Sequence, residues 1–351
     1  MGDHLDMTIR IAAALLGIGC IFYFFKSIIR VGVLNQRYQD PLAFWIGRLV
    51  MRAFQCRIAL LRMKDRKANE LLTWYWPMAL IGIISAWFLL VTLGFALLNW
   101  AFLANPTFIE AIISSGSALS TLGFSTPPSL SGQILAIIEG AIGLFLIVYL
   151  FTFLPGFMDL IHERGLRVEW VYARTNNKPS GAALIEWYAT AGRLDDLNAI
   201  WEDWEVFFRN LGQSKSFLPI LSVIRPLIPT HSWVCAFGAL LDALALLISS
   251  VEKDARSARL CFDCGVESLQ IIHSAMRGSL IVPRKSPDLL HVRRADYDVA
   301  WNRLAAAGLP MAADQEAAWL RFIECHKQYE QEIAWMAATL SDPFPYWHAE
   351  K

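Results

Sequence analysis

Charged residues are scarce in this sequence, and neither sign is in excess. Asp, Glu, Lys and Arg make up 18% of the 351 residues, against about 25% in an average soluble domain. The 31 basic and 31 acidic side chains cancel, which removes the overall positive charge that a nucleic-acid-binding protein would use. Hydrophobic residues reach 56%, so we expect part of the chain to lie in lipid and no nucleic acid to be its partner.

Several patterns that would indicate an enzyme or a sensor module are missing. There is no Gly-rich fingerprint between a strand and a helix, no run of alternating apolar residues typical of strands, and no nucleophile, base and acid set. We therefore expect the protein not to be an enzyme and to use no cofactor.

Cysteine is also infrequent. Most of the six lie in segments that we place in the membrane or the cytoplasm, so we expect no disulfide. Cys261 and Cys264 form a C-x-x-C pair, and Cys325 precedes His326 far downstream. A zinc site is the weaker interpretation, because the second pair is adjacent rather than spaced, and we favour ordinary buried thiols.

Three long apolar runs stand in the first 160 residues. They extend from about Thr8 to Phe25, from about Pro77 to Leu103 and from about Ile134 to Leu154, each near the roughly 20 residues that cross a bilayer. We predict three transmembrane helices. The first lacks a small-residue cleavage site after its apolar run, which makes a cleaved signal peptide the weaker alternative.

The linker between the first two runs is basic, whereas the N-terminal MGDHLDM contains no Lys or Arg. Because cytoplasmic loops collect basic residues, we predict that the N-terminus lies outside and that everything after about Phe157 is cytoplasmic. Residues 41–63 mix apolar residues with arginines, as a helix lying on anionic headgroups would. A helix packed on the cytoplasmic domain is an equally good interpretation. Basic residues between the two runs include Arg30, Arg37, Arg48, Arg52, Arg57, Arg62, Lys64, Arg66 and Lys67.

A shorter apolar segment separates the second and third runs. Residues 107–120, TFIEAIISSGSALS, are too few to cross a bilayer and too apolar for a free loop, which predicts a re-entrant half-helix covered by protein. The C-terminal end of such a helix carries partial negative charge toward the membrane centre, where it favours a cation. The residues STLGFST that follow could turn carbonyl oxygens toward an axis and replace the water shell of an ion.

This order of helix, half-helix, Thr-Leu-Gly-Phe-Ser-Thr and a final helix with a central glycine resembles the pore module of potassium channels, whose filter reads Thr-Val-Gly-Tyr-Gly-Asp. Gly143 follows Gly123 at about the spacing of the hinge glycine in that family, and Gly132 matches a glycine at the start of the inner helix. WYWPMALIGIISAW, IIEGAIGL, YLFTFLP and the tail resemble bacterial relatives of two-pore-domain channels.

The resemblance implies a homotetramer in a bacterial inner membrane, with lipids as neighbours and K⁺ as the permeant ion. The inner helix would bend at Gly143 and close near Tyr149, Phe153 and Pro155, where Pro155 would end its regular hydrogen bonding. No specific cytoplasmic ligand or partner protein is indicated. The filter would consist of Thr121, Leu122, Gly123, Phe124 and Ser125, with K⁺ held at the first four.

Two positions depart from the family pattern. Ser125 stands where the second filter glycine is expected, and Thr126 where an acid is usual. Filter glycines adopt positive φ, which costs a serine roughly 1 kcal/mol or more, so we expect strain at Ser125 and weaker discrimination against sodium. A filter with one glycine and a nearby serine also resembles the Trk/Ktr potassium transporters, which carry four pore repeats in one chain, whereas this chain has one.

Glu139 is the one acidic residue inside a predicted span. Facing lipid it would cost on the order of 3 kcal/mol, so we expect it to face protein or water. It is either a cation-attracting or gating carboxylate near the filter or a hydrogen-bond partner of Ser114, Ser115 or Ser117, and we favour the second.

The remainder of the chain shows helical spacing of apolar residues with Pro and Gly breaks. Residues 231–252 are long enough to span, but Asp242 at their centre favours a buried core helix. We thus predict an all-α membrane protein with three transmembrane helices, a re-entrant pore helix and filter, and a helical cytoplasmic domain. Its parts are an N-terminal transmembrane helix (1–32), a basic cytoplasmic or interfacial linker (33–75), the pore module (76–157) and the cytoplasmic domain (158–351).

Two functions from different classes remain open. The first is a tetrameric cation channel that conducts potassium with weakened selectivity and is gated by the inner helix and the cytoplasmic domain. The second is a membrane sensor or scaffold that keeps the pore fold without conducting.

Overall fold

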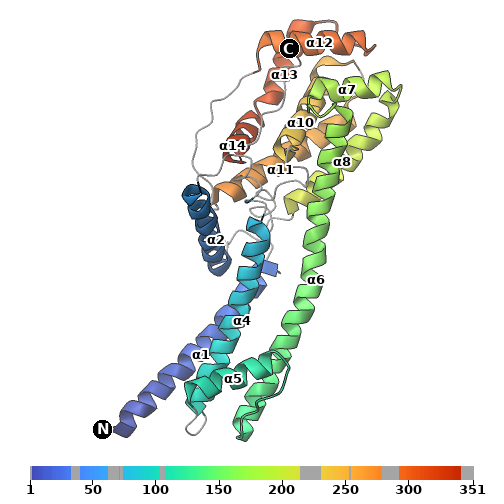
Figure 1. Cartoon of the computed structure of the whole chain (residues 1–351). Helices are drawn as coiled ribbons and strands as arrows, with labels where there is room; N and C mark the ends of the chain where they lie inside the picture. The colour runs from blue at the N-terminus through green and yellow to red at the C-terminus, as the bar shows by residue number, and fades with distance from the viewer. Residues whose placement is uncertain are drawn as a thin grey trace. The chain divides into compact units, whose positions relative to one another are not determined.

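The computed structural model (Figure 1) describes residues 2–32, 40–61, 71, 74–102, 107–213, 231–252, 254–278 and 292–340. All regular elements in these ranges are helices, apart from an isolated bridge between Val251 and Met311. The predicted all-α class is therefore confirmed for the described residues. The chain divides into two compact units, Met1–Met158 and Asp159–Lys351.

Four helices are long and apolar enough to cross a membrane, which confirms the expectation of a multi-pass membrane protein. In the first unit these are α1 (Gly2–Gly32), with its apolar part at Met7–Val31, α4 (Tyr75–Phe102) and the first part of α6 (Leu130–Arg174). The fourth, α10 (Trp233–Ser250), belongs to the second unit. The first unit also contains α2 (Pro41–Leu60) and the short α5 (Phe108–Leu119).

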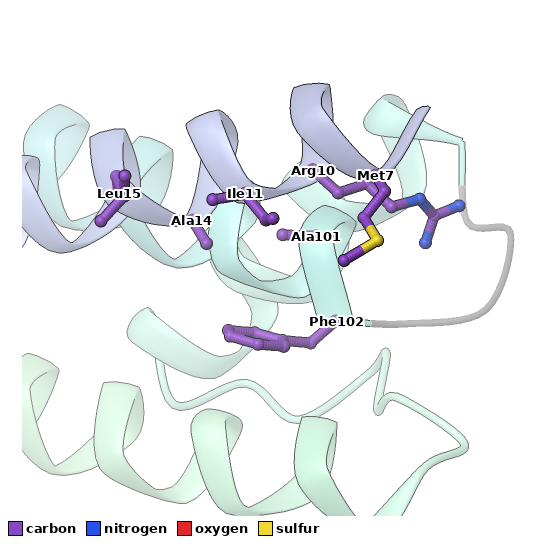
Figure 2. A pocket seen from close by; sticks show the side chains of 7 residues that line it. All are labelled: Met7, Arg10, Ile11, Ala14, Leu15, Ala101 and Phe102. Atoms are coloured by element: carbon purple, nitrogen blue, oxygen red, sulfur yellow. The ribbon is translucent and has the colours of Figure 1, made fainter. Parts of the chain in front are cut away.

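Helices α1 and α4 cross with their backbones almost in contact. A Cβ atom added to Gly17 would lie 2.6 Å from the Gly94 carbonyl oxygen, and one added to Gly94 would lie 3.1 Å from that of Gly17. Small residues permit this close approach between helices in lipid. Beyond the crossing, an open groove of about 640 Å³ lies between the first turns of α1 and the last turn of α4, as Figure 2 shows. Its lining is Met7, Arg10, Ile11, Ala14, Leu15, Ala101 and Phe102.

A polar chain joins the C-terminal part of α1 and the middle of α4 to α2. Trp87 Nε1 of α4 donates to Ser27 Oγ of α1 at 2.9 Å, and Ser27 Oγ donates to Asp40 Oδ2 at 2.9 Å. The same Asp40 oxygen accepts from Ala43 N at 3.0 Å and caps the N-terminus of α2. Trp87, Ser27 and Asp40 are buried, so this joint fixes where α2 begins.

Helix α6 corrects one expectation about the inner helix. We predicted that it ends near Leu154 and that Pro155 interrupts its hydrogen bonding, whereas the helix continues through Pro155 to Arg174. A proline deprives the ladder of one donor, and a helix that is regular on both sides can tolerate this loss. The boundary between the two units, at Met158 and Asp159, therefore falls inside a helix.

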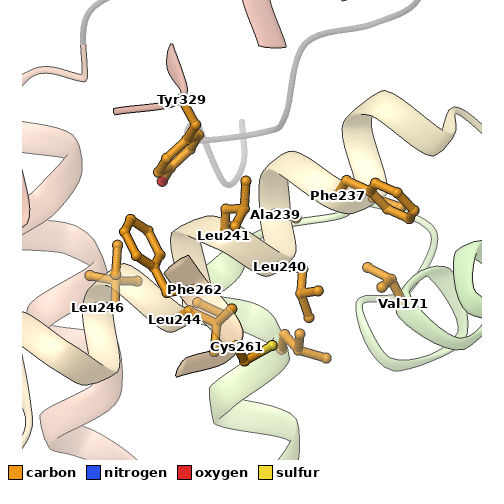
Figure 3. Close-up of a cluster of buried hydrophobic side chains, with 14 of the residues drawn as sticks. Val171, Phe237, Ala239, Leu240, Leu241, Leu244, Leu246, Cys261, Phe262 and Tyr329 are labelled. Carbon is orange, nitrogen blue, oxygen red and sulfur yellow. The ribbon is translucent and has the colours of Figure 1, made fainter. Parts of the chain in front are cut away.

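The second unit packs its helices around α10. Seventeen of the 18 residues of α10 are buried, and its side chains meet those of Val171, Cys261, Phe262 and Tyr329 in the cluster of Figure 3. A helix that is apolar all round suits such a position, because every face meets protein. The other elements are the end of α6, α7 (Gly181–Thr190), η1 (Leu194–Asp196), α8 (Leu197–Gln213), α11 (Arg256–Gly278), α12 (Arg294–Ala306), α13 (Gln315–His326) and α14 (Glu330–Leu340).

Asp242 lies in the middle of this core, where two polar side chains contact its carboxylate. Tyr329 Oη donates to Asp242 Oδ1 at 2.5 Å, and His326 Nε2 lies 3.7 Å from the same oxygen. Burial, together with the nearby carboxylate of Asp242, raises the pKa of Tyr329 well above its usual value, which keeps its hydrogen available. The partners of Asp242 thus come from α13, which carries His326, and from the turn between α13 and α14, which carries Tyr329.

The thiols of the second unit lie where apolar packing dominates. Cys261 and Cys325 are buried, and burial raises the pKa values of both thiols and of Cys264. Among the described residues, no group of three His, Cys, Asp or Glu side chains is placed to hold a metal ion.

We predict that Asp242→Leu destabilises the protein. If α10 faced lipid, the substitution would remove a costly charge, but in a protein core it leaves the Tyr329 hydroxyl without its acceptor, at about 1–3 kcal/mol. Urea unfolding in detergent, followed by tryptophan fluorescence, measures the change. Tyr329→Phe is the matched variant, and the double mutant should cost less than the sum of the two. A Leu variant more stable than wild type would contradict the core position.

Candidate functional site

The half-helix α5 starts from a capping box. Thr107 Oγ1 accepts from Glu110 N at 3.3 Å, and Glu110 Oε2 accepts from Thr107 N at 3.0 Å. The helix has 12 residues, which at 1.5 Å each give about 18 Å, too short for a bilayer core of about 30 Å. The chain leaves it after Leu119 as an irregular loop and begins α6 at Leu130. Helix α5 therefore cannot cross the membrane by itself.

The loop has an unusual backbone. Thr121 has φ +57° and Gly123 has φ +66°, so the two residues on either side of Leu122 adopt left-handed conformations. Among the described non-glycine residues, positive φ otherwise occurs only at Asn176 and Asn177. Ser125 is not in this group, so the strain expected there is absent: its side chain imposes no cost because its φ is not positive.

Alternate N–H groups of the loop are tied back to α5. Thr121 N donates to Ala118 O at 3.0 Å, Gly123 N donates to Ser117 O at 3.2 Å, and Ser125 N donates to Ser117 Oγ at 2.9 Å. Ser117 thus holds the loop with two different oxygens and is itself buried.

The carbonyl groups consequently have a defined direction. In a trans peptide the C=O of one residue points opposite to the N–H of the next. Since the N–H groups of residues 121, 123 and 125 point toward α5, the carbonyls of Ser120, Leu122 and Phe124 point away from it. None of these three carbonyls accepts a hydrogen bond from the residues that the structure describes. Thr121, Leu122, Gly123 and Phe124 are exposed in the single chain, with Leu122 at 72% and Phe124 at 67%.

Glu139 lies behind the half-helix. It is fully buried, and its Oε1 is 2.5 Å from Ser115 Oγ, which also lies 2.8 Å from the carbonyl oxygen of Thr92 in α4. A serine hydroxyl has one hydrogen, and the Thr92 carbonyl can only accept. Both contacts are satisfied together when the Glu139 carboxyl is protonated and donates to Ser115 while Ser115 donates to Thr92. Of the two roles considered for Glu139, the contact with a half-helix serine is the one present.

Two glycines of α6 let the end of α5 approach closely. A Cβ atom on Gly143 would lie 2.1 Å from the Leu119 carbonyl oxygen, and one on Gly140 would lie 3.4 Å from that of Ala118. The last turn of α5, from which the loop departs, therefore rests on the backbone of α6. Gly143 therefore has a packing role. The sequence comparison with potassium channels predicted only a hinge at this residue.

The expected gate residues lie further along α6. The Tyr149 ring stacks on that of Phe153 at 5.3 Å between centroids and meets the Trp87 ring edge-on at 6.1 Å. Tyr149 is thus turned toward α4, and through Trp87 it adjoins the joint with Ser27 and Asp40. Pro155 is exposed.

Two serines of the half-helix were placed only coarsely by sequence reasoning. Ser115 and Ser117 stood among the hydroxyls that could meet Glu139, but the role of Ser117 as an anchor for the loop was missed. Its signal was available, because a serine six residues before a glycine at the end of a short helix can reach back to the loop backbone.

No family model, no curated protein and no solved structure matches the chain.

We predict that Gly143→Ala displaces the end of α5, because the new methyl group would overlap the Leu119 carbonyl. The matched control is Gly156→Ala in the same helix, where a Cβ atom meets nothing within 4 Å. Thermal unfolding in detergent should show a clear loss of stability for Gly143→Ala and little change for Gly156→Ala. Equal stability of the two variants would exclude the packing role and leave only a hinge.

A second pair of variants tests the proton count at Glu139. Glu139→Gln keeps a donor for Ser115 through its amide and should preserve stability within about 1 kcal/mol. Glu139→Leu leaves Ser115 with one partner and adds no donor, so it should unfold at a lower temperature than the Gln variant. A Gln variant as damaged as the Leu variant would show that the carboxylate form is needed.

Proposed function

We propose that the protein is one subunit of a tetrameric cation channel that conducts K⁺ through a filter formed by Thr121, Leu122, Gly123, Phe124 and Ser125. The observation that carries this proposal is the direction of the loop peptides. The N–H groups of Thr121, Gly123 and Ser125 are used by α5, whereas the carbonyls of the residues before them, Ser120, Leu122 and Phe124, point away and accept no hydrogen bond within the described residues. Carbonyl oxygens arranged in this way replace the water shell of a monovalent cation.

One chain supplies only one carbonyl at each level of the loop, so a coordination shell requires several copies around an axis. Two features support association. Leu122 and Phe124 are large apolar side chains exposed on a polar loop, and α6 is apolar but mostly uncovered within the chain. The exposed apolar residues of α6 include Ile134, Ile137, Ile138, Leu144, Phe145, Val148 and Phe151. Fourfold symmetry is the choice that the family resemblance implies.

In this channel Glu139 holds the half-helix in position and does not line the ion pathway. Because it is enclosed by α5 and contacts Ser115, it contributes to the position of the half-helix and not to the attraction of ions. We assign gating to α6. Gly143 packs against the half-helix, and Tyr149, Phe153 and Pro155 follow it along α6. The membrane is proposed to be a bacterial inner membrane with the N-terminus outside and the second unit in the cytoplasm. Of the residues on which this orientation rests, Arg37, Arg62, Lys64, Arg66 and Lys67 lie outside the described residues.

Selectivity is proposed to be weaker than in filters with two glycines. Ser125 N is bound to Ser117 Oγ, and its φ is not positive. A second glycine with positive φ would add an outermost ring of carbonyl ligands, and this chain does not form that ring. Discrimination between K⁺ and Na⁺ depends on the number of such ligands.

Reconstitution into K⁺-loaded vesicles tests the proposal, with flux followed by a potential-sensitive dye. We predict K⁺ flux that barium blocks and that Gly123→Ala reduces at least about tenfold, because alanine at φ +66° costs roughly 1–2 kcal/mol in each of the four subunits that form the filter. Gly116→Ala is the control, since a Cβ atom there meets nothing within 4 Å and the residue lies on α5. A stable tetramer without flux would favour the alternative, a scaffold that keeps the pore fold.

A further inference from the structure

Helix α2 exposes a stripe that no other described element of the first unit covers. At spacings of three and four residues it presents Trp45, Leu49, Arg52, Cys56 and Leu60, of which Trp45 is 60% exposed, Leu49 68% and Leu60 84%. Arg48 and Arg57 flank this stripe, and the Arg48 guanidinium lies 5.8 Å from the Trp45 ring centroid. The helix contains no acidic residue. We call these seven residues the α2 outer face.

The opposite face of α2 is fixed to the transmembrane helices. A Cβ atom on Gly82 of α4 would lie 2.8 Å from Ile46 Cγ2, so the two helices touch at this point. The cap residue Asp40 is held by Ser27, five residues before the end of α1. The outer face is therefore presented by a helix whose start and inner side cannot move freely.

The contacts of α2 also place it at one boundary of the bilayer. A core of about 30 Å takes about 20 helical residues, and counting these back from Phe102 reaches Ile83. The turns of α4 before Ile83 then lie in the headgroup layer, and Gly82, where α2 packs, is among them. The apolar part of α1 ends at Val31, close to the same boundary.

We propose that the α2 outer face binds the anionic phospholipid surface on this side of the membrane, with Trp45, Leu49 and Leu60 in the boundary layer and the arginines on the lipid phosphates. Arginine and tryptophan next to each other on one face suit a layer that is apolar on one side and negatively charged on the other. The proposal concerns α2 alone and holds whether or not the chain conducts ions.

Cys56 offers a direct test, because it lies in the α2 outer face and is the exposed one of the six cysteines. The full-length protein, labelled there with an environment-sensitive dye, is placed in nanodiscs of phosphatidylcholine with increasing phosphatidylglycerol. We expect the dye emission to move to shorter wavelength and headgroup spin labels to quench it as the anionic fraction rises. High salt should reverse the change in the labelled protein that keeps its three arginines, since the attraction is electrostatic.

The triple variant Arg48→Gln, Arg52→Gln, Arg57→Gln should bind the anionic surface on the order of a hundredfold more weakly, given about fivefold per arginine, and should therefore lose the response at anionic fractions that saturate the wild type. The control is Arg256→Gln, an exposed arginine of the second unit. Two results would overturn the proposal. A dye that iodide quenches equally with and without phosphatidylglycerol means that the face stays in water. A dye protected equally in pure phosphatidylcholine means that protein or neutral lipid covers the face.

Discussion

Backbone N–H and C=O groups inside a bilayer need hydrogen-bond partners, and the loop after α5 obtains them for alternate N–H groups from Ser117 and Ala118 while three carbonyls stay open. This imbalance is the constraint on which the first unit depends. The loop keeps its position only if α5 keeps its own. Helix α5 packs against the glycines of α6, and its Ser115 contacts both Glu139 of α6 and the Thr92 carbonyl of α4. In the proposed channel these open carbonyls are the groups that would hold a cation, with further copies of the chain completing its coordination.

Much of the fold could be predicted from sequence because apolar runs of bilayer length leave few alternatives to helix. The positions of α1, α4 and the start of α6 follow from this rule. The end of α6 did not, because a proline was expected to stop the helix although residues on both sides favour its continuation. The enclosed position of α10 was favoured on the basis of Asp242, whose partners Tyr329 and His326 are more than 80 residues away and have no local signal.

The site was predicted at the level of the segment and less well at the level of contacts. The half-helix and the glycine after it can be read from length and composition. The φ values of Thr121 and Ser125 could not, since they depend on which loop N–H groups Ser117 accepts. Gly143 was predicted as a flexible point, but a sequence does not distinguish a glycine that bends from one that allows a carbonyl of a neighbouring helix to approach.

The crossing of Gly17 and Gly94 has a mechanical consequence. At this crossing the backbone of each helix approaches that of the other, and the side chains of Ile21 and Leu98 pack tightly beside the contact, which leaves little room to absorb a displacement. Helix α1 covers one flank of α4, so lateral pressure from the acyl chains on that flank acts first on α1 and passes to α4 without cushioning. Changes in bilayer tension would therefore reach the helix that carries Thr92 and Trp87 through a stiff contact.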